Sequence, residues 1–85
     1  MPMKKVDVKY NPQLIKIGLN VAYYRKLNKL TQEQLAEKAS ESRTTIANIE
    51  SADKFHSMAL GTLFKIADVL DIPIRKLFTF RDEND

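Results

Sequence analysis

Apolar side chains recur every three or four residues along most of this chain, which is the spacing of helices that bury one face. The pattern predicts helices over residues 13–27, 32–39, 43–51 and 58–70, followed by a short one over 74–78. Only short connections separate them, so we expect an all-α fold of about five helices. The positions expected to face the core are Leu14, Ile15, Ile17, Val21, Tyr24, Leu27, Leu35, Ala36, Ala39, Ile46, Ile49, Leu60, Leu63, Ile66, Ala67, Leu70, Ile74, Leu77 and Phe78.

Capping residues mark where the two short middle helices begin. Thr31 and Gln34 fit a capping box, in which each side chain accepts a hydrogen bond from the other residue's backbone N–H. Ser42 is a favourable N-cap for the following helix, and Pro12 fits the first turn of the first one. Residues 40–42 leave room only for a tight turn. Two short helices joined in this way have the spacing of a helix-turn-helix, whose second helix enters the DNA major groove.

The outer face of the third predicted helix carries side chains suited to reading bases. Arg43 and Ala47 are four residues apart, as are Thr44 and Asn48, so all four share one exposed patch. Arginine can read guanine, asparagine can read adenine, and the threonine methyl group can contact thymine. Chemistry alone leaves base readout and a plain polar face equally open. Gln32 likewise either fills a first-turn position or hydrogen-bonds a phosphate.

Length and charge narrow the class of protein. Eighty-five residues suffice for one small domain and exclude a large barrel or a doubly wound sheet. Fourteen basic and eleven acidic residues give a net charge of +3, which either serves solubility or attracts a polyanion. There is no secretory signal and no apolar run of roughly 18–20 residues that could span a bilayer. We therefore expect a cytoplasmic protein without membrane contact.

Residues for catalysis or metal binding are sparse. His56 is the single histidine and cysteine is absent, so we expect no metal site and no disulfide. No nucleophile with an oriented base and no glycine-rich phosphate loop can be recognised, which leaves an enzyme as the least supported class. No cofactor or small-molecule ligand is indicated. Met58 and Phe64 are expected to be packing residues.

Residues 30–51, LTQEQLAEKASESRTTIANIES, resemble the helix-turn-helix of the Cro/repressor-type (XRE-like) DNA-binding family. The preceding VAYYRKLNKL and the later LFKIADVLDIPIRKLF resemble the flanking helices of that family. The piece SRTTI, residues 42–46, also resembles the recognition helix of restriction–modification controller proteins. The resemblance implies a compact, lambda-repressor-like domain of five helices that binds double-stranded DNA.

The resemblance also assigns roles to individual residues. It implies that Gln32 contacts a phosphate of the DNA. It also implies DNA contacts for five residues of the recognition helix and its cap, namely Ser42, Arg43, Thr44, Thr45 and Asn48. It pairs Arg25 with Glu50, and the position of Glu50 at the negative end of a helix dipole favours such a cationic partner. We expect a buried, doubly hydrogen-bonded ion pair. Ser40 stands where the family often has glycine, so the turn must accept a side chain there.

The remaining departures from the family concern the loop and the chain ends. Residues 51–57 lack the glycine and proline that many members have, and Lys54 is our candidate for a phosphate contact there. We expect a flexible basic arm over 1–11, the DNA-binding domain over 12–80 and an acidic tail over 81–85. Phe78 caps the core while Phe80 stays a lone exposed ring, or the last helix forms a dimer contact.

These features together predict a sequence-specific transcriptional regulator, a repressor or autoregulator, that binds a palindromic operator as a homodimer. One recognition helix reads too few base pairs for useful specificity, whereas a two-fold dimer reads two half-sites. The alternative is an antitoxin whose main partner is a protein toxin.

Overall fold

The computed structural model describes residues 11–51 and 58–80. These ranges hold four α-helices, α1 (Asn11–Leu27), α2 (Gln32–Lys38), α3 (Arg43–Glu50) and α4 (Leu60–Leu70), and the 3-10 helix η2 (Ile74–Phe78). The described residues form no strand, which confirms the predicted all-α class. The predicted fifth helix is the 3-10 helix η2 and not an α-helix, and its five residues are typical of the short segments in which 3-10 helices occur.

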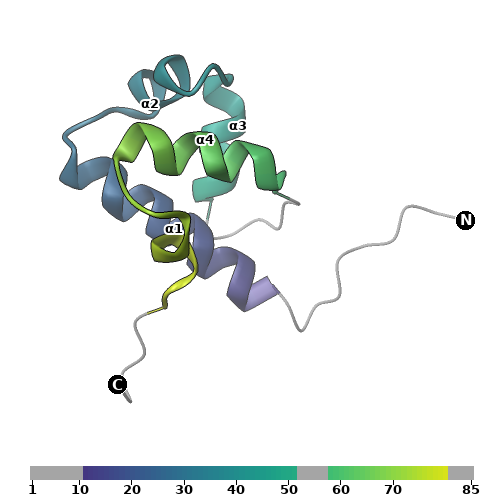
Figure 1. Ribbon diagram of the computed structural model, residues 1–85. Coiled ribbons are helices and arrows are strands. Elements are labelled where there is room, and N and C mark those ends of the chain that lie inside the picture. Colours follow the sequence, from purple (N-terminus) through teal and green to yellow (C-terminus); the bar gives the residue numbers. More distant parts are fainter. Residues whose placement is uncertain (1–10, 52–57, 81–85) are drawn as a thin grey trace, which may run out of the picture.

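Helix α3 lies between α1 and α2 and makes the most extensive contacts with both of them. In Figure 1, α2 is at the top of the molecule, α1 is at the bottom, and α4 crosses the front. Helix η2 packs against α1 and α4. The Asn20 amide on α1 donates hydrogen bonds to the carbonyl oxygens of Leu77 and Thr79, at 2.9 and 3.1 Å. The end of the described chain is thereby tied to α1.

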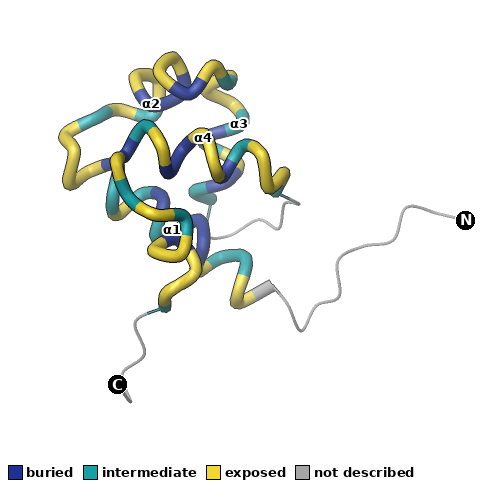
Figure 2. Tube along the Cα trace, in the orientation of Figure 1, coloured by how far each residue is buried: buried dark blue, intermediate teal, exposed yellow. Residues whose placement is uncertain are grey.

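The core consists of apolar side chains from all five helices, which face inward as the dark segments of Figure 2 show. Most of the predicted core positions are buried or partly buried against it. The predictions for Leu27, Leu60 and Phe78 were wrong, because these side chains are exposed. Each is the first or last residue of its helix, where fewer neighbouring side chains can cover it. Phe64 is also exposed and is not the packing residue that its sequence position suggested.

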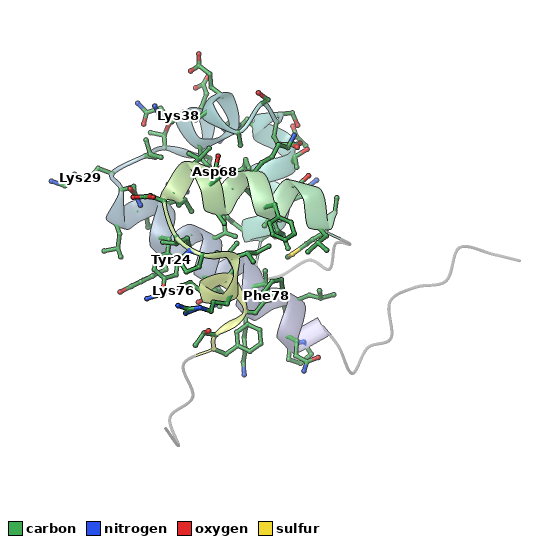
Figure 3. All side chains as sticks on the ribbon, viewed as in Figure 1. Tyr24, Lys29, Lys38, Asp68, Lys76 and Phe78 are labelled. Carbon is green, nitrogen blue, oxygen red and sulfur yellow. The ribbon has the colours of Figure 1, made fainter. Side chains whose placement is uncertain are left out.

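The prediction that Phe78 caps the core while Phe80 is exposed was wrong, because the structure has the opposite arrangement. Phe80 packs partly buried against the core, with the Lys16 ammonium 5.6 Å from the centre of its ring. Phe78 instead projects from η2 into solvent (Figure 3). The phenyl group that completes the core is therefore the one that follows η2.

Helices α1, α2 and α4 all turn into the next segment through a non-glycine residue in the left-handed conformation. These residues are Lys29, Ser40 and Asp71, with φ values of 59°, 55° and 59°. After α2, the backbone N–H of Glu41 donates to the carbonyl of Ala36 at 2.9 Å, which satisfies a helix-end acceptor. The turn thus accepts the side chain of Ser40, although glycine adopts this conformation at lower cost.

Gly18 permits a close approach between α1 and the end of α3. A Cβ atom placed on Gly18 would overlap the carbonyl oxygen of Ile49 far inside van der Waals contact. Since that obstacle is backbone, it cannot rotate away as a side chain could. The absence of a side chain at Gly18 therefore determines how near α1 can lie to the end of α3.

Candidate nucleic-acid interface

Helix α3 is capped at its start and anchored along its inner side. The Ser42 hydroxyl accepts a hydrogen bond from the backbone N–H of Thr45 at 3.0 Å and also lies 2.9 Å from the Thr45 hydroxyl. Ile46 and Ile49 are buried on the side that faces α1 and α2. The predicted N-cap is confirmed, as is the capping box of Thr31 and Gln34 at the start of α2. Both helices of the motif are therefore held by local bonds as well as by the core.

The opposite side of α3 exposes the predicted base-reading residues. Arg43, Thr44 and Asn48 are all exposed and have no hydrogen-bonding side-chain partner within the described residues. Thr45 is half-buried, and its hydroxyl is already near that of Ser42. The structure thus brings Arg43, Thr44 and Asn48 together on solvent-facing surface and places Thr45 at the edge of the patch.

The first turn of α3 contains no acidic residue. Its unpaired backbone N–H groups and the positive end of the helix dipole therefore act in the same sense as the Arg43 guanidinium. A phosphate group next to this turn would be attracted by all three.

Arg25 and Glu50 form a buried ion pair across the motif. Arg25 donates from Nε to Glu50 Oε2 at 2.7 Å and from Nη2 to Glu50 Oε1 at 3.0 Å. The two side chains are only 11% and 5% exposed. Arg25 also donates from Nη1 to the carbonyl of Leu30 at 2.7 Å. Helix α1, the α1–α2 turn and the end of α3 therefore meet at one guanidinium group.

Gln32 joins this network, which sequence reasoning did not anticipate. Its amide Nε2 donates to Glu50 Oε1 at 3.0 Å, so one carboxylate receives bonds from α1 and from α2. Gln32 lies at the first position of α2 and is half-buried. An amide carries a second N–H and a carbonyl oxygen, so this bond does not use up the groups that a phosphate could contact. No signal in the sequence connects residues 32 and 50.

A second polar cluster joins the turn of the motif to α4. Glu41 accepts from the Lys65 ammonium at 2.6 Å and from the Thr62 hydroxyl at 3.1 Å. The hydrogen bond from Lys65 is the main reason that the pKa of Glu41 lies below its ordinary value. Next to this cluster is a hollow of about 310 Å³, lined by Glu41, Thr45, Asn48, Ile49, Met58, Ala59 and Thr62. The start of α4 therefore borders the exposed side of α3.

Lys54 and His56 lie outside the described residues. Among residues 11–51 and 58–80, no three His, Cys, Asp or Glu side chains are grouped so that they could hold a metal ion. Over the same ranges, no helix combines the length and the apolar content needed to traverse a membrane.

Comparison with known proteins assigns the fold to a family. The Helix-turn-helix family model matches residues 21–77, which is more than half of the chain. The chain belongs to the helix-turn-helix family. This match covers both helices of the motif together with α4 and most of η2, and it confirms the resemblance to XRE-like DNA-binding regulators.

Similar proteins point to the same family. The uncharacterized HTH-type transcriptional regulator MJ0272 of Methanocaldococcus jannaschii is 43% identical over 61 residues, which cover 72% of this chain and 89% of that one. The restriction–modification controller protein C.AhdI of Aeromonas hydrophila has a similar structure, with a TM-score of 0.69 and 31% identity over 79% of this chain and 98% of that chain. SinR, a master regulator of biofilm formation solved in complex with DNA, has a TM-score of 0.68 and 28% identity over 74% and 98% of the two chains.

Proposed function

We propose that this helix-turn-helix regulator binds a palindromic operator in a sequence-specific manner as a homodimer, and acts as a repressor or autoregulator. The observation that carries the proposal is the two-sided character of α3. Arg43, Thr44 and Asn48 are exposed on one side, while Ile46 and Ile49 hold the other side in the core. The similarity to SinR, which was solved with DNA, supports DNA as the partner.

Each exposed residue suits a different contact. Arg43 can donate two hydrogen bonds to guanine, Asn48 can pair with the edge of adenine, and the Thr44 methyl group can contact the methyl group of thymine. Ser42 and Thr45 stand at the N-terminal end of α3, the end of a recognition helix whose residues contact the DNA. Together these positions form the proposed specific interface.

Phosphate contacts would orient α3 in the groove without reading sequence. Gln32 is proposed to contact a phosphate through the amide groups that Glu50 leaves available. Lys54, which lies outside the described residues, is also proposed to contact a phosphate. The network of Arg25, Glu50 and Gln32 would then act as a positioning device, because it holds α1, α2 and α3 in one relative orientation. A single DNA molecule would contact two such units, related by the two-fold axis of a dimer.

Arg43→Ala tests the proposed readout. Loss of a two-bond contact to guanine should cost about 1–3 kcal/mol of specific binding and relax the preference at one base pair. DNA fragments selected from a random pool by the wild-type protein supply the binding site. Arg75→Ala is the matched control, because Arg75 is also exposed but lies on η2. If Arg43→Ala keeps both affinity and preference, the proposed reading face is wrong.

Gln32→Ala separates orientation from readout. We expect weaker binding to all sequences by a similar factor, because a phosphate contact carries no base information. Binding of the wild-type protein should also fall steeply as salt rises, since each phosphate contact releases counterions. Fluorescence anisotropy with specific and random duplexes at several salt concentrations measures both effects. A flat salt response would argue against a phosphate-dominated interface.

A further inference from the structure

Helix α1 carries a row of large apolar side chains that the core does not use. Leu19, Tyr23 and Leu27 follow one another at four-residue spacing and are 48%, 39% and 59% exposed. Residues four apart share one face of a helix, so these three side chains, which we call the α1 row, form one strip along it. Isolated apolar residues are common on protein surfaces, but a row along one helix face is typical of contact with another protein.

Two lysines lie on the same helix face as the α1 row. Lys16 precedes Tyr23 by seven residues and Lys26 follows Leu19 by seven, and seven residues bring a helix back to nearly the same side. Both lysines are exposed, and within residues 11–51 and 58–80 neither pairs with an acidic side chain. The strip is therefore apolar along its middle and positively charged near both ends.

The two helices on this side of the molecule contain no carboxylate that would balance the lysines. Helix α1 has no Asp or Glu. Helix η2, which packs against α1, adds Arg75 and Lys76 and also has no acidic residue. The acidic residues Glu33 and Glu37 belong to α2, which Figure 1 shows at the top of the molecule with α1 at the bottom. This side therefore attracts negatively charged partners.

One end of the α1 row borders a hollow that suits an anchoring side chain. The hollow has a volume of about 280 Å³ and is lined by Lys16, Leu19, Asn20, Tyr23 and Phe80. Its lining combines a leucine and two aromatic rings with the Lys16 ammonium, which lies 5.6 Å from the centre of the Phe80 ring. An apolar side chain with a carboxylate next to it would be complementary to both parts of this lining.

We infer that the α1 row and its hollow bind an acidic amphipathic helix of another protein. Apolar side chains of that helix, three or four residues apart, cover the row, and one of them fills the hollow. Asp and Glu side chains beside the apolar strip meet Lys16 and Lys26. The inference does not depend on the proposed function, because none of these residues belongs to the proposed DNA interface.

Other occupants match the surface less well. Two-fold pairing of two copies along the row would bring lysines against lysines, with no carboxylate on α1 or η2 to offset their repulsion. A nucleic-acid backbone would satisfy the lysines but would leave the two leucines of the row uncovered. Only an occupant that carries acidic and apolar groups together is complementary to the whole strip.

The α1 row faces away from the recognition helix. Gly18 marks the side of α1 that meets α3, since a Cβ there would overlap the carbonyl oxygen of Ile49. At 3.6 residues per turn, Tyr23 and Leu27 project about 140° and 180° away from Gly18 around the helix axis. A helix bound to the row would therefore leave the exposed side of α3 uncovered. We expect the partner helix and DNA to bind the same molecule together.

The size of the row predicts the strength of binding. Three apolar side chains and two lysines cover less than the roughly 800 Å² per partner of a standard interface. We therefore expect reversible binding in the micromolar range, which weakens as salt screens the lysines.

Selection from a random display library of helix-forming peptides, about 16 residues and four turns long, tests the inference on the full chain. The enriched peptides should be acidic, with apolar residues at positions i, i+3 or i+4, and i+7. Synthetic copies of them are then titrated by fluorescence anisotropy. Leu19→Ser with Leu27→Ser should weaken binding by about tenfold or more. Leu60→Ser with Phe64→Ser removes two exposed apolar groups from α4 instead and is the matched control, which should bind like the wild-type protein. Circular dichroism verifies that each variant is folded.

Lys16→Glu with Lys26→Glu tests the role of charge separately. This variant should bind the enriched acidic peptides about tenfold more weakly or worse. Versions of the same peptides with lysine in place of each acidic residue should prefer this variant over the wild-type protein, because the attraction is restored with opposite signs. Equal binding of both peptide versions to both proteins would contradict a charge-directed contact.

Several results would overturn the inference. Enriched peptides that are neutral or basic, or that bind the α1 serine variant as tightly as the wild-type protein, would do so. Weaker binding of random duplex DNA to the Lys16→Glu, Lys26→Glu variant, with acidic peptides unaffected, would make nucleic acid the occupant. A wild-type dimer in sedimentation velocity that the α1 serine variant dissociates would make a second copy the occupant.

DNA fragments selected by the wild-type protein test the expected joint binding. Acidic peptides should bind the protein saturated with such a fragment as tightly as they bind the free protein. Mutual exclusion of peptide and DNA would contradict a binding position on the far side of α1 from α3. If no DNA is bound, the proposed function fails, while the peptide titrations still decide whether the α1 row is a binding surface.

Discussion

Replacing Glu50 by glutamine is the most direct test of how the motif is held together. Glutamine has almost the same shape as glutamate but no charge. In the structure, the Glu50 carboxylate accepts two hydrogen bonds from Arg25 and one from Gln32 while almost fully buried. After the substitution, the Arg25 guanidinium remains buried, with the Leu30 carbonyl as its other acceptor. A buried cation would then lack its counter-charge.

The size of the effect follows from this geometry. Removing one partner of a buried ion pair costs about 3–5 kcal/mol, because the remaining charge stays desolvated. Arg25 retains some exposure, and the glutamine oxygen can still accept one bond, so we expect about 3 kcal/mol. A domain of this length has a total stability of about 4–13 kcal/mol. At about 4–8 °C per kcal/mol, the melting temperature should fall by roughly 12–24 °C.

Thermal and urea unfolding at neutral pH, followed by circular dichroism, measure this loss. The series comprises Glu50→Gln, Arg25→Met and the double variant. The double variant should be more stable than the sum of the two single losses predicts, because no unpaired charge is left in the interior. Glu37→Gln on the exposed side of α2 is the matched control and should change stability by no more than about 0.5 kcal/mol.

Two results would refute this reasoning. One is that both single variants are as stable as the wild-type protein, since a stranded buried charge must be costly. The other is that the two losses simply add, since residues joined by two hydrogen bonds must be coupled.

Three further perturbations test other parts of the fold. Gly18→Ala should destabilise the protein by about 2 kcal/mol or more in urea unfolding, because the added Cβ meets the Ile49 carbonyl. This loss should outweigh the better helix propensity of alanine. An unchanged urea midpoint would contradict the close approach of α1 and α3. Ser40→Gly should raise stability by about 0.5–1 kcal/mol, because it relieves a left-handed side-chain residue at φ 55°, and a loss of stability would show that Ser40 contributes more than its backbone conformation. Lys65→Met should reduce the acid sensitivity of unfolding. Because the pKa of Glu41 is lowered in the folded protein, its pairing with Lys65 stabilises the fold near neutrality, and this stabilisation is lost as pH falls through the folded-state pKa. Parallel stability–pH curves for the variant and the wild-type protein would exclude this contribution.

Local sequence determined the helices and their starts. The spacing of apolar residues located all four α-helices to within about two residues at each end, and Thr31 and Ser42 cap the helices that they were predicted to cap. These features depend on neighbours a few residues away, so they can be read directly from the chain. The last helix was predicted less well, because a five-residue segment between Pro73 and Thr79 gives periodicity too few positions to distinguish a 3-10 from an α-helix.

The candidate site was only partly accessible from sequence. The outward direction of Arg43, Thr44 and Asn48 follows from helical spacing against Ile46 and Ile49, and the structure has that arrangement. The predicted pairing of Arg25 with Glu50 came mainly from family resemblance, because a helix dipole can favour a cation without identifying which residue supplies it.

Only the tertiary structure decided which distant groups meet. Gln32 reaches Glu50 across 18 positions of sequence, and Gly18 lies against the carbonyl of Ile49. Tertiary packing also left Leu60 and Phe64 outside the core, although their spacing matches that of buried helix residues. Periodicity reports which side of a helix is apolar, but the edge of the core depends on where neighbouring helices end. The position of the core's edge is determined by how whole helices pack against one another, and no local pattern along the chain encodes that position.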